Sequence, residues 1–426
     1  MLLLHVSDIH FHHPICTTDR DPDRPYRTRL VQDVKDWQPK LGKFDAILVT
    51  GDIAYAGKEA EYTEARKWLD ELAAAAGCGP HHVHVIPGNH DVDRQIILDR
   101  LPIRNAQQAI IAAQNKERVL AAQLDHTETG PALLAPMEAY AKFAARYSCD
   151  LFWPEKFFWR HDLQLAPGVL LRIFGLTSTI LSGNRLPEDD RAGDLYLSPQ
   201  QTVLNPEDNV VNLVMSHHPP DWFLDKDDVE DAVNGRAAIH LFGHKHRQRI
   251  HRDPSYVTFY AGAVNPVRQE KDWKPGYNII RIELGRDAND RPQLEIEAHL
   301  LEWQKSPEMF KAILDDDHDR SPVYRATVRL RNIRAADNHV PAREVSAMVQ
   351  QVAEAAVKEE RAKAIVLRFW DLSMADRREI SQKLNLLEPG DAGLTLAEKY
   401  GRALIRAGER DLFEKLAKEI EKKERH

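Results

Sequence analysis

The chain has 426 residues, with 58 Lys and Arg against 66 Asp and Glu, so its formal net charge is −8. This length exceeds the usual size of a single hydrophobic core, which predicts one large domain and a smaller one. The acidic balance excludes an overall basic surface of the kind that binds long nucleic acids, although a local basic patch is compatible with it.

The cysteines and the N-terminal residues indicate the cellular compartment that we expect for the protein. Cys16, Cys78 and Cys149 are far apart and form no CxxC pair, which is typical of a reducing compartment, and we expect all three to be inert. The segment Met1–Leu4 is too short for a signal peptide and predicts a buried first strand. Since no run approaches the roughly 18 apolar residues of a membrane span, we expect a cytoplasmic protein without membrane association.

Short apolar runs rich in β-branched residues recur along the first two thirds of the chain. Glycine or polar residues follow each run, which is typical of buried strands in an α/β protein. The predicted strands are Leu2–Val6, Ala46–Val49, Val83–Ile86, Leu170–Phe174, Val211–Met215, Ala238–Phe242 and Val257–Tyr260. Apolar residues at helical spacing predict a helix over Glu59–Ala76.

The segment 94–188 departs from this alternation of strands and helices. Its composition predicts an alanine-rich helix over Gln107–Leu124 and an amphipathic helix over Pro136–Tyr147. Because the segment follows the loop Gly88–Asp91, we expect an insertion that hangs over that loop. It is either a substrate-selecting cap or a structural embellishment.

The C-terminal third of the chain contains the expected end of the first domain and a connecting segment. Strands over Tyr277–Leu284 and Leu294–Leu301 are expected to complete the first domain, which we place at residues 1–303. The acidic run Asp315–Asp317 marks a boundary within a connecting segment, 304–363, which also contains a strand signal at Tyr324–Leu330.

Helical patterns then predict a small all-helical domain over residues 364–426. A helical pattern over Ala342–Ala362 precedes this domain in the connecting segment, and the helices predicted within the domain are Met374–Leu384 and Leu396–Ile420. Ser373 with Asp376, and Thr395 with Glu398, form capping boxes at the starts of the last two.

Polar motifs lie at or just beyond the ends of the predicted strands, where α/β sheets build their sites. They are Asp8-Ile9-His10, Gly51-Asp52, Gly88-Asn89-His90-Asp91, His217-His218-Pro219-Pro220 and Gly243-His244-Lys245-His246. Carboxylate, amide and imidazole groups together suit Mn, Fe, Zn or Ni better than Mg or Ca. The motifs therefore predict a transition-metal centre, and their glycines allow close backbone approach or serve as turn residues.

The order of these motifs resembles the signature of the calcineurin-like metallophosphoesterases, from residue 1 to about 303. The resemblance implies an α/β fold, a β-sandwich flanked by helices, with two divalent metals about 4 Å apart that clamp a phosphate ester and activate water. It assigns Asp8, His10, Asp52 and His246 to one metal, and Asp52, Asn89, His217 and His244 to the other. Mn is the expected metal, with Fe, Zn or Ni as alternatives.

Neighbouring residues have expected roles as well. The resemblance makes His90 the general acid for the leaving group, and Asp91 is expected to orient it or a neighbouring ligand. His218 and His12 are candidates for binding substrate phosphate, with a plain surface imidazole as the alternative for each. Four further histidines are expected to be ordinary strand or loop residues: His5, His13, His82 and His84.

The sequence around Gly51-Asp52 limits the class of substrate that we expect. It continues Ile53-Ala54-Tyr55 and lacks the Asp-Arg-Gly of the related protein serine/threonine phosphatases. The layout looks more like the cyclic-nucleotide phosphodiesterase branch, which implies hydrolysis of a nucleotide or nucleic-acid phosphodiester. A DNA nuclease of the double-strand-break-repair type and a partner-binding scaffold with a structural metal site are the alternatives.

The C-terminal region resembles the effector-associated adaptor domains of bacterial conflict systems. The likeness lies in Phe369-Trp370-Asp371-Leu372-Ser373, Arg377–Leu387 and the loop Glu388–Asp391. It implies recruitment of a protein partner or self-association, in a bacterial defence or signalling system. A generic helical cap or dimerisation bundle is the alternative.

Overall fold

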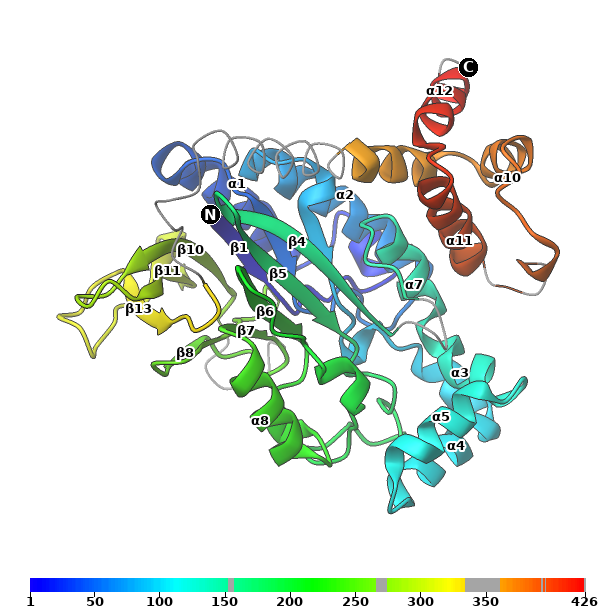
Figure 1. Cartoon of the computed structure of the whole chain (residues 1–426), viewed down its shortest axis with the longest axis horizontal. Helices are drawn as coiled ribbons and strands as arrows, with labels where there is room; N and C mark the ends of the chain where they lie inside the picture. Colours follow the sequence, from blue (N-terminus) through cyan, green and yellow to red (C-terminus); the bar gives the residue numbers. More distant parts are fainter. Residues whose placement is uncertain (152–156, 266–273, 334–360, 392–393, 395, 425–426) are drawn as a thin grey trace.

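The computed structural model describes residues 1–151, 157–265, 274–333, 361–391, 394 and 396–424. Two β-sheets face each other, and helices cover their outer faces (Figure 1). Fully buried side chains from both sheets, such as Leu4 and Ile279 of one and Leu213 and Phe259 of the other, share one core. The predicted α/β sandwich with a C-terminal helical region is confirmed.

The first sheet has the strand order β12-β11-β10-β1-β2-β3, and β13 also pairs with β11. Strands β1, β2 and β3 run parallel, and β10 joins β1 in antiparallel orientation. The strands are β1 (Leu2–Val6), β2 (Ala46–Val49), β3 (Val83–Val85), β10 (Gly276–Arg286), β11 (Pro292–Lys305), β12 (Glu308–Ala312) and β13 (Tyr324–Arg329).

This sheet continues past residue 303, where the sequence predicts the end of the first domain. Strands β12 and β13 both pair with β11 and bury Phe310 and Val328 in the core. The expected connecting segment 304–363 therefore begins with strands of the first sheet.

The second sheet has the strand order β4-β5-β6-β7-β9-β8. The four inner strands run parallel, and the two edge strands are antiparallel to their neighbours. The strands are β4 (Phe158–Ala166), β5 (Val169–Leu176), β6 (Val210–Ser216), β7 (Ile239–Phe242), β8 (Arg249–Arg252) and β9 (Val257–Tyr260).

Helices α1 and α2 cover the first sheet and α8 the second (Figure 1). Helix α2 buries the apolar face that its periodicity predicts, including Tyr62, Trp68 and Leu69, and ends at Gly77, whose φ is 73°. The main helices before the C-terminal region are α1 (Arg24–Leu41), α2 (Glu59–Ala76), α3 (Arg94–Asp99), α4 (Leu101–Ala112), α5 (Lys116–Asp125), α6 (Thr129–Leu134), α7 (Glu138–Ala145) and α8 (Lys226–Arg236). Short 3₁₀ helices are η1 (Ile15–Thr17), η2 (Pro80–His82), η3 (Asn89–Asp91), η4 (Ala135–Met137), η5 (Pro199–Thr202), η6 (Pro220–Trp222) and η7 (Pro389–Asp391).

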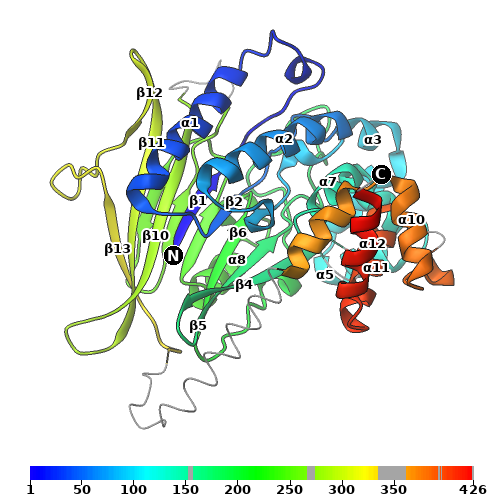
Figure 2. The same cartoon turned by 90° about the horizontal axis from the view of Figure 1, so that it is seen from above.

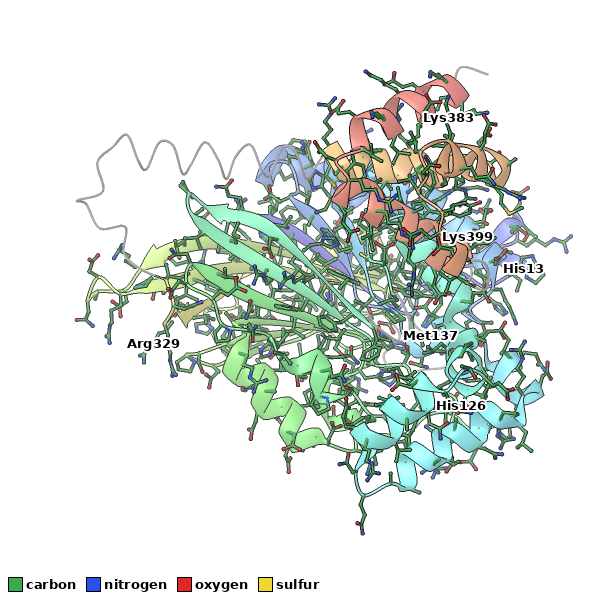
Figure 3. All side chains as sticks on the ribbon, turned by 45° about the vertical axis from the view of Figure 1, so that its right-hand side comes forward. His13, His126, Met137, Arg329, Lys383 and Lys399 are labelled. Atoms are coloured by element: carbon green, nitrogen blue, oxygen red, sulfur yellow. The ribbon has the colours of Figure 1, made fainter. Side chains whose placement is uncertain are left out.

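The segment 94–188 contains helices α3 to α7 and then β4 and β5, which belong to the second sheet. The single helix predicted over Gln107–Leu124 is wrong: α4 ends at Ala112, and the Asn115 side chain caps α5 by accepting from Arg118 N at 2.9 Å. Met137 faces the interior, whereas His126 lies on the outer part of these helices (Figure 3).

The C-terminal helices lie together beside α7 (Figure 2). They are the helix at 361–371, α10 (Met374–Lys383), α11 (Leu396–Glu409) and α12 (Phe413–Glu424), around a core that includes Phe369, Ile380 and Leu416. The pattern predicted as one helix over Leu396–Ile420 is interrupted by Asp411, whose φ is 51°. Ser373 caps α10 as predicted, by accepting from Asp376 N.

Two sequence predictions for this region lie outside the described residues: most of the helix Ala342–Ala362, and the capping residue Thr395. Among the helices that the structure describes, none has the length and apolar character needed to cross a membrane.

Candidate metal centre

The seven proposed metal ligands come from five loops that meet at one end of the two sheets. Each loop follows the C-terminal end of a parallel strand, and such ends lie at a common edge. Asp8 and His10 follow β1, Asp52 follows β2, Asn89 follows β3, His217 follows β6, and His244 and His246 follow β7. The structure therefore brings all seven together.

Asp52 lies between the two proposed ligand groups. Its Oδ2 atom is 3.3 Å from His10 Nε2, in the first group, and 3.3 Å from His217 Nε2, in the second. Its Oδ1 atom accepts a hydrogen bond from the His90 backbone N–H at 2.8 Å. One carboxylate oxygen thus faces an imidazole of each group, as a bridging ligand requires.

The remaining donor atoms are spaced as metal ligands are. His246 Nε2 is 3.1 Å from Asp8 Oδ1, while Asn89 Oδ1 is 3.2 Å from His217 Nε2 and 3.1 Å from His244 Nδ1. Bonds of about 2.1 Å at tetrahedral or octahedral angles separate adjacent donors by roughly 3.0–3.4 Å. The donor set and its spacing fit two divalent transition metals.

The backbone at these ligands is strained. Five of the seven have φ between 52° and 67°, in the left-handed region that residues other than glycine seldom adopt. They are Asp8, His10, Asp52, His244 and His246. Such conformations cost about 1–3 kcal/mol each and persist where the surrounding structure enforces them, often at functional sites.

Electrostatics in the group favour the metal-binding protonation states of the two carboxylates and of His244. Burial opposes ionisation of Asp8 and Asp52, but the neighbouring charges of His246 and His217, respectively, outweigh it and lower both pKa values. Burial lowers the pKa of His244 to about 3, with His217 adding to the effect. Burial also opposes protonation of His217, yet Asp52 raises its pKa to about 9. Ionised carboxylates and a neutral imidazole are the forms that bind metals, and a metal would displace the proton of His217.

Backbone carbonyls orient two of the imidazoles. His10 Nδ1–H donates to the carbonyl of Asn265 at 3.0 Å, and His217 Nδ1–H donates to the carbonyl of Thr50 at 2.7 Å. Each bond turns the Nε2 atom toward Asp52. Asn265, whose side chain also donates to Ile9 O at 2.6 Å, was not predicted from the sequence because a single Asn outside a motif gives no signal.

Glycines permit the close approach of the loops. A Cβ atom on Gly88 would lie 2.1 Å from Asp52 Oδ1, and one on Gly51 would lie 2.6 Å from His217 Nδ1. Gly51 also has a φ of 94°. At these positions the absence of a side chain is needed for the ligands to occupy their places.

Asp91 contacts the loops of the neighbouring ligands, the second of its two expected roles, which stays a prediction. It is fully buried, and its carboxylate accepts from the backbone N–H groups of Ala54 and Gly88, both at 2.9 Å, and from the Tyr62 hydroxyl at 2.9 Å. Burial raises its pKa to about 7, and the charge of Asp52 adds to this shift. Asp91 therefore fixes the loops that carry Asp52 and Asn89, whereas the backbone of Tyr55 orients His90.

His90 lies beside the first ligand group. Its Nδ1–H donates to Tyr55 O at 2.8 Å, and its ring centroid is 4.8 Å from that of His10. This arrangement leaves Nε2 as the nitrogen that can carry a proton to a substrate oxygen. Burial lowers the pKa of His90, and the charge of Asp52 opposes that shift.

The two expected phosphate-binding histidines lie in different environments. His12 is exposed and stacks on Tyr55 with centroids 4.1 Å apart, so its role stays a prediction. His218 is fully buried, bonded through Nδ1 to Ser178 Oγ at 2.8 Å, with its ring centroid 4.5 Å from that of His244. Its Nε2 atom has no hydrogen-bond partner among the described residues, and its expected role in binding phosphate stays a prediction.

Comparison with known families agrees with this geometry. The family model described as calcineurin-like phosphoesterase matches residues 1–248, more than half of the chain. The chain belongs to the calcineurin-like phosphoesterase family. A second family model, the GTPase-associated adaptor domain, matches residues 361–422, so the expected adaptor character of the C-terminal helices is confirmed.

Individual relatives of this phosphoesterase are distant. The uncharacterized metallophosphoesterase-like protein YydB of Bacillus subtilis (strain 168) is 30% identical over 97 residues, which cover 22% of this chain and only 18% of YydB. Vps29 of Chaetomium thermophilum is 10% identical with a TM-score of 0.31, covering 78% of this chain and 99% of that one. A putative 5′-nucleotidase of Staphylococcus aureus is 12% identical with a TM-score of 0.33, covering 83% and 58%.

Proposed function

We propose that this calcineurin-like phosphoesterase is a phosphodiesterase that uses two divalent transition metals, Mn²⁺ foremost, to hydrolyse a nucleotide or nucleic-acid phosphodiester. The observation that carries the proposal is Asp52 Oδ2, equidistant at 3.3 Å from an imidazole of each ligand group. When bound, two such ions would neutralise the phosphoryl oxygens and generate the nucleophile from water.

The side chains of the protein then have distinct tasks. Asp8, His10 and His246 would hold one ion, Asn89, His217 and His244 would hold the other, and Asp52 would be shared by both. In its protonated, imidazolium form His90 donates its Nε2 proton to the departing oxygen, and the neutral ring that remains keeps its Nδ1–H bonded to Tyr55 O.

Aromatic side chains on both sides of the centre support a nucleotide substrate. Tyr55 is 40% exposed, with its ring centroid 5.2 Å from that of His90. Trp222 is half-buried on the other side, 3.9 Å from the His244 ring. Such rings stack on nucleobases with little sequence preference.

The adaptor domain supports a second part of the proposal, in which the C-terminal helices recruit a protein partner or a second copy of the chain. Fused to a phosphoesterase, such a module would bring phosphodiester hydrolysis to an assembly, as in a bacterial defence or signalling system. Deleting residues 364–426 should then spare hydrolysis and abolish recruitment.

Hydrolysis of bis-p-nitrophenyl phosphate with Mn²⁺ tests the catalytic part. We expect Asp52→Asn to lose both activity and metal, whereas His90→Gln should retain metal and lose about 10²–10⁴-fold in kcat, the usual contribution of a general acid. The control is His251→Gln, an exposed histidine on β8. An inactive wild type, or full activity in His90→Gln, would contradict the mechanism.

Neither the nuclease nor the scaffold alternative gains support from the described features. A panel of cyclic nucleotides, linear oligonucleotides and plasmid DNA with Mn²⁺ separates them. Cleavage of plasmid alone would favour the nuclease, and stoichiometric metal without turnover of any phosphodiester would favour the scaffold.

A further inference from the structure

A second cluster of metal-binding groups lies outside the proposed catalytic centre. His84 on β3, Cys149 after α7 and His161 on β4 each place one ligand atom within 4.8 Å of the others. These residues belong to three separate segments, and none of them is a proposed ligand of the catalytic metals. The sequence predicts ordinary roles for His84 and Cys149, and the structure brings them together.

The surroundings of His84 indicate that a ligand binds there. Its side chain is fully buried, and neither ring nitrogen has a hydrogen-bond partner among the described residues. A buried polar group without a partner costs about 1–3 kcal/mol, and native proteins seldom leave one unless a water or ion occupies the place. Burial also lowers the pKa of His84 well below its usual value, with His161 and Lys363 adding to the shift, so the ring is neutral.

The other two groups are oriented as metal ligands usually are. His161 Nε2–H donates to the carbonyl of Ser148 at 2.8 Å, which leaves the lone pair on Nδ1. Cys149 is fully buried; its Sγ accepts from the Val85 backbone N–H at 3.4 Å, and its S–H donates to Tyr147 O at 3.5 Å, a proton that a bound metal would displace. Two imidazoles and one thiolate form a borderline-soft donor set that selects zinc over magnesium or calcium.

We propose that His84, Cys149 and His161 are the three protein ligands of a zinc site, with water in the fourth position, that joins the edge strands of the two sheets. Tetrahedral zinc would separate these donors by about 3.3–3.7 Å, and their ligand atoms lie within 4.8 Å of one another. The site would hold β3 against β4, where Trp159 Nε1–H already donates to Val85 O at 2.9 Å. Because β3 leads into the loop of Asn89 and His90, zinc at this place would also steady that loop.

Cobalt substitution distinguishes this site from the catalytic centre. Co²⁺ bound by a thiolate gives a near-ultraviolet charge-transfer band, and none of the seven proposed catalytic ligands is a cysteine. We expect the full-length protein loaded with Co²⁺ to show the band. Cys149→Ser should abolish it, while the matched controls Cys16→Ser and Cys78→Ser, at the other two buried cysteines, should retain it.

His161→Gln provides a second variant in case Cys149→Ser does not fold, because His161 is only half-buried. With a circular dichroism spectrum like that of the wild type, it should lose the band or shift it, and bind one zinc fewer per chain by elemental analysis. Absence of the band in the wild type, or an unchanged band in Cys149→Ser, would overturn the proposal.

Discussion

Tyr55 contributes to the proposed site through its backbone carbonyl and through its side-chain ring. Its carbonyl holds His90, while its ring is exposed beside the centre. The carbonyl is present whatever the side chain, so the two contributions can be separated by substitution.

We predict that Tyr55→Ala raises KM for a nucleotide substrate about tenfold to a hundredfold, the usual cost of losing one stacked base, with kcat nearly unchanged. Tyr55→Phe should behave like the wild type because it keeps the ring. Steady-state kinetics on the best nucleotide of the panel measure both. An equal fall in kcat for the two variants would argue against stacking.

Gly88 is a residue at which one added methyl group should disrupt the centre. A Cβ atom there would lie 2.1 Å from Asp52 Oδ1 and 2.4 Å from Asp52 N, so the bridging carboxylate would have to move. Since displacement of a catalytic group by about 1 Å costs roughly 10²-fold, Gly88→Ala should lose at least that factor in kcat/KM, together with bound Mn²⁺. Gly235→Ala is the control, because its Cβ would meet nothing within 4 Å.

At the scale of elements, continuous apolar runs predicted the buried strands, and the order of motifs at their ends predicted which side chains meet. The edge strand β4 was missed because Arg160, His161 and Asp162 interrupt its apolar pattern where one side faces solvent. Strand β12 was missed for a similar reason, since only Phe310 of its five residues is buried. The backbone carbonyls of Tyr55 and Asn265 orient histidines of the site. Because every residue has such a carbonyl, the sequence could not predict these two roles.

The interface between the adaptor helices and the phosphoesterase depends on a charged network. Arg146, at the end of α7, bonds Asp371 at 3.2 Å and Asp70 of α2 at 3.1 Å, and its side chain is 10% exposed. Burial alone would lower the pKa of Arg146, but Tyr147 and Asp371 raise it. The guanidinium therefore stays charged between two carboxylates from different elements.

Arg146→Ala should weaken this docking. The carboxylates are 37% and 45% exposed, so solvent screening limits the loss to about 1 kcal/mol. We expect the calorimetric transition of the adaptor helices to move to lower temperature, with that of the phosphoesterase domain unchanged. Arg378→Ala, an exposed arginine of α10, serves as the control. A single unshifted transition in Arg146→Ala would show that apolar packing alone holds the domains together.

Buried neutral histidines make the stability of the protein depend on pH. His240 is 1% exposed, donates from Nε2 to Ala237 O at 3.0 Å, and has its pKa lowered to about 4, chiefly by burial. In the unfolded chain its pKa is about 6.5. The unfolded state therefore binds more protons between these values, and the free energy of unfolding falls as the pH falls through this window.

From this difference we predict that His240 accounts for about 2 kcal/mol of stability lost between pH 7 and pH 5. Urea unfolding at the two pH values should show a smaller loss in His240→Gln than in the wild type. His126→Gln, at an exposed position of the insertion, should lose as much as the wild type. Equal losses in all three proteins would mean that other groups govern acid stability.

The left-handed backbone at five of the proposed ligands has a consequence for metal choice. Hydrogen bonds of the protein hold these loops, such as Asp8 N to Gly51 O at 3.0 Å and Ile9 N to Asp52 O at 2.8 Å. Folding therefore supplies the free energy that the strained backbone costs. The donor atoms are already in place before an ion would bind. A fixed geometry of this kind would favour cations whose preferred coordination matches it, so the shape of the site, together with cellular supply, would decide among similar cations.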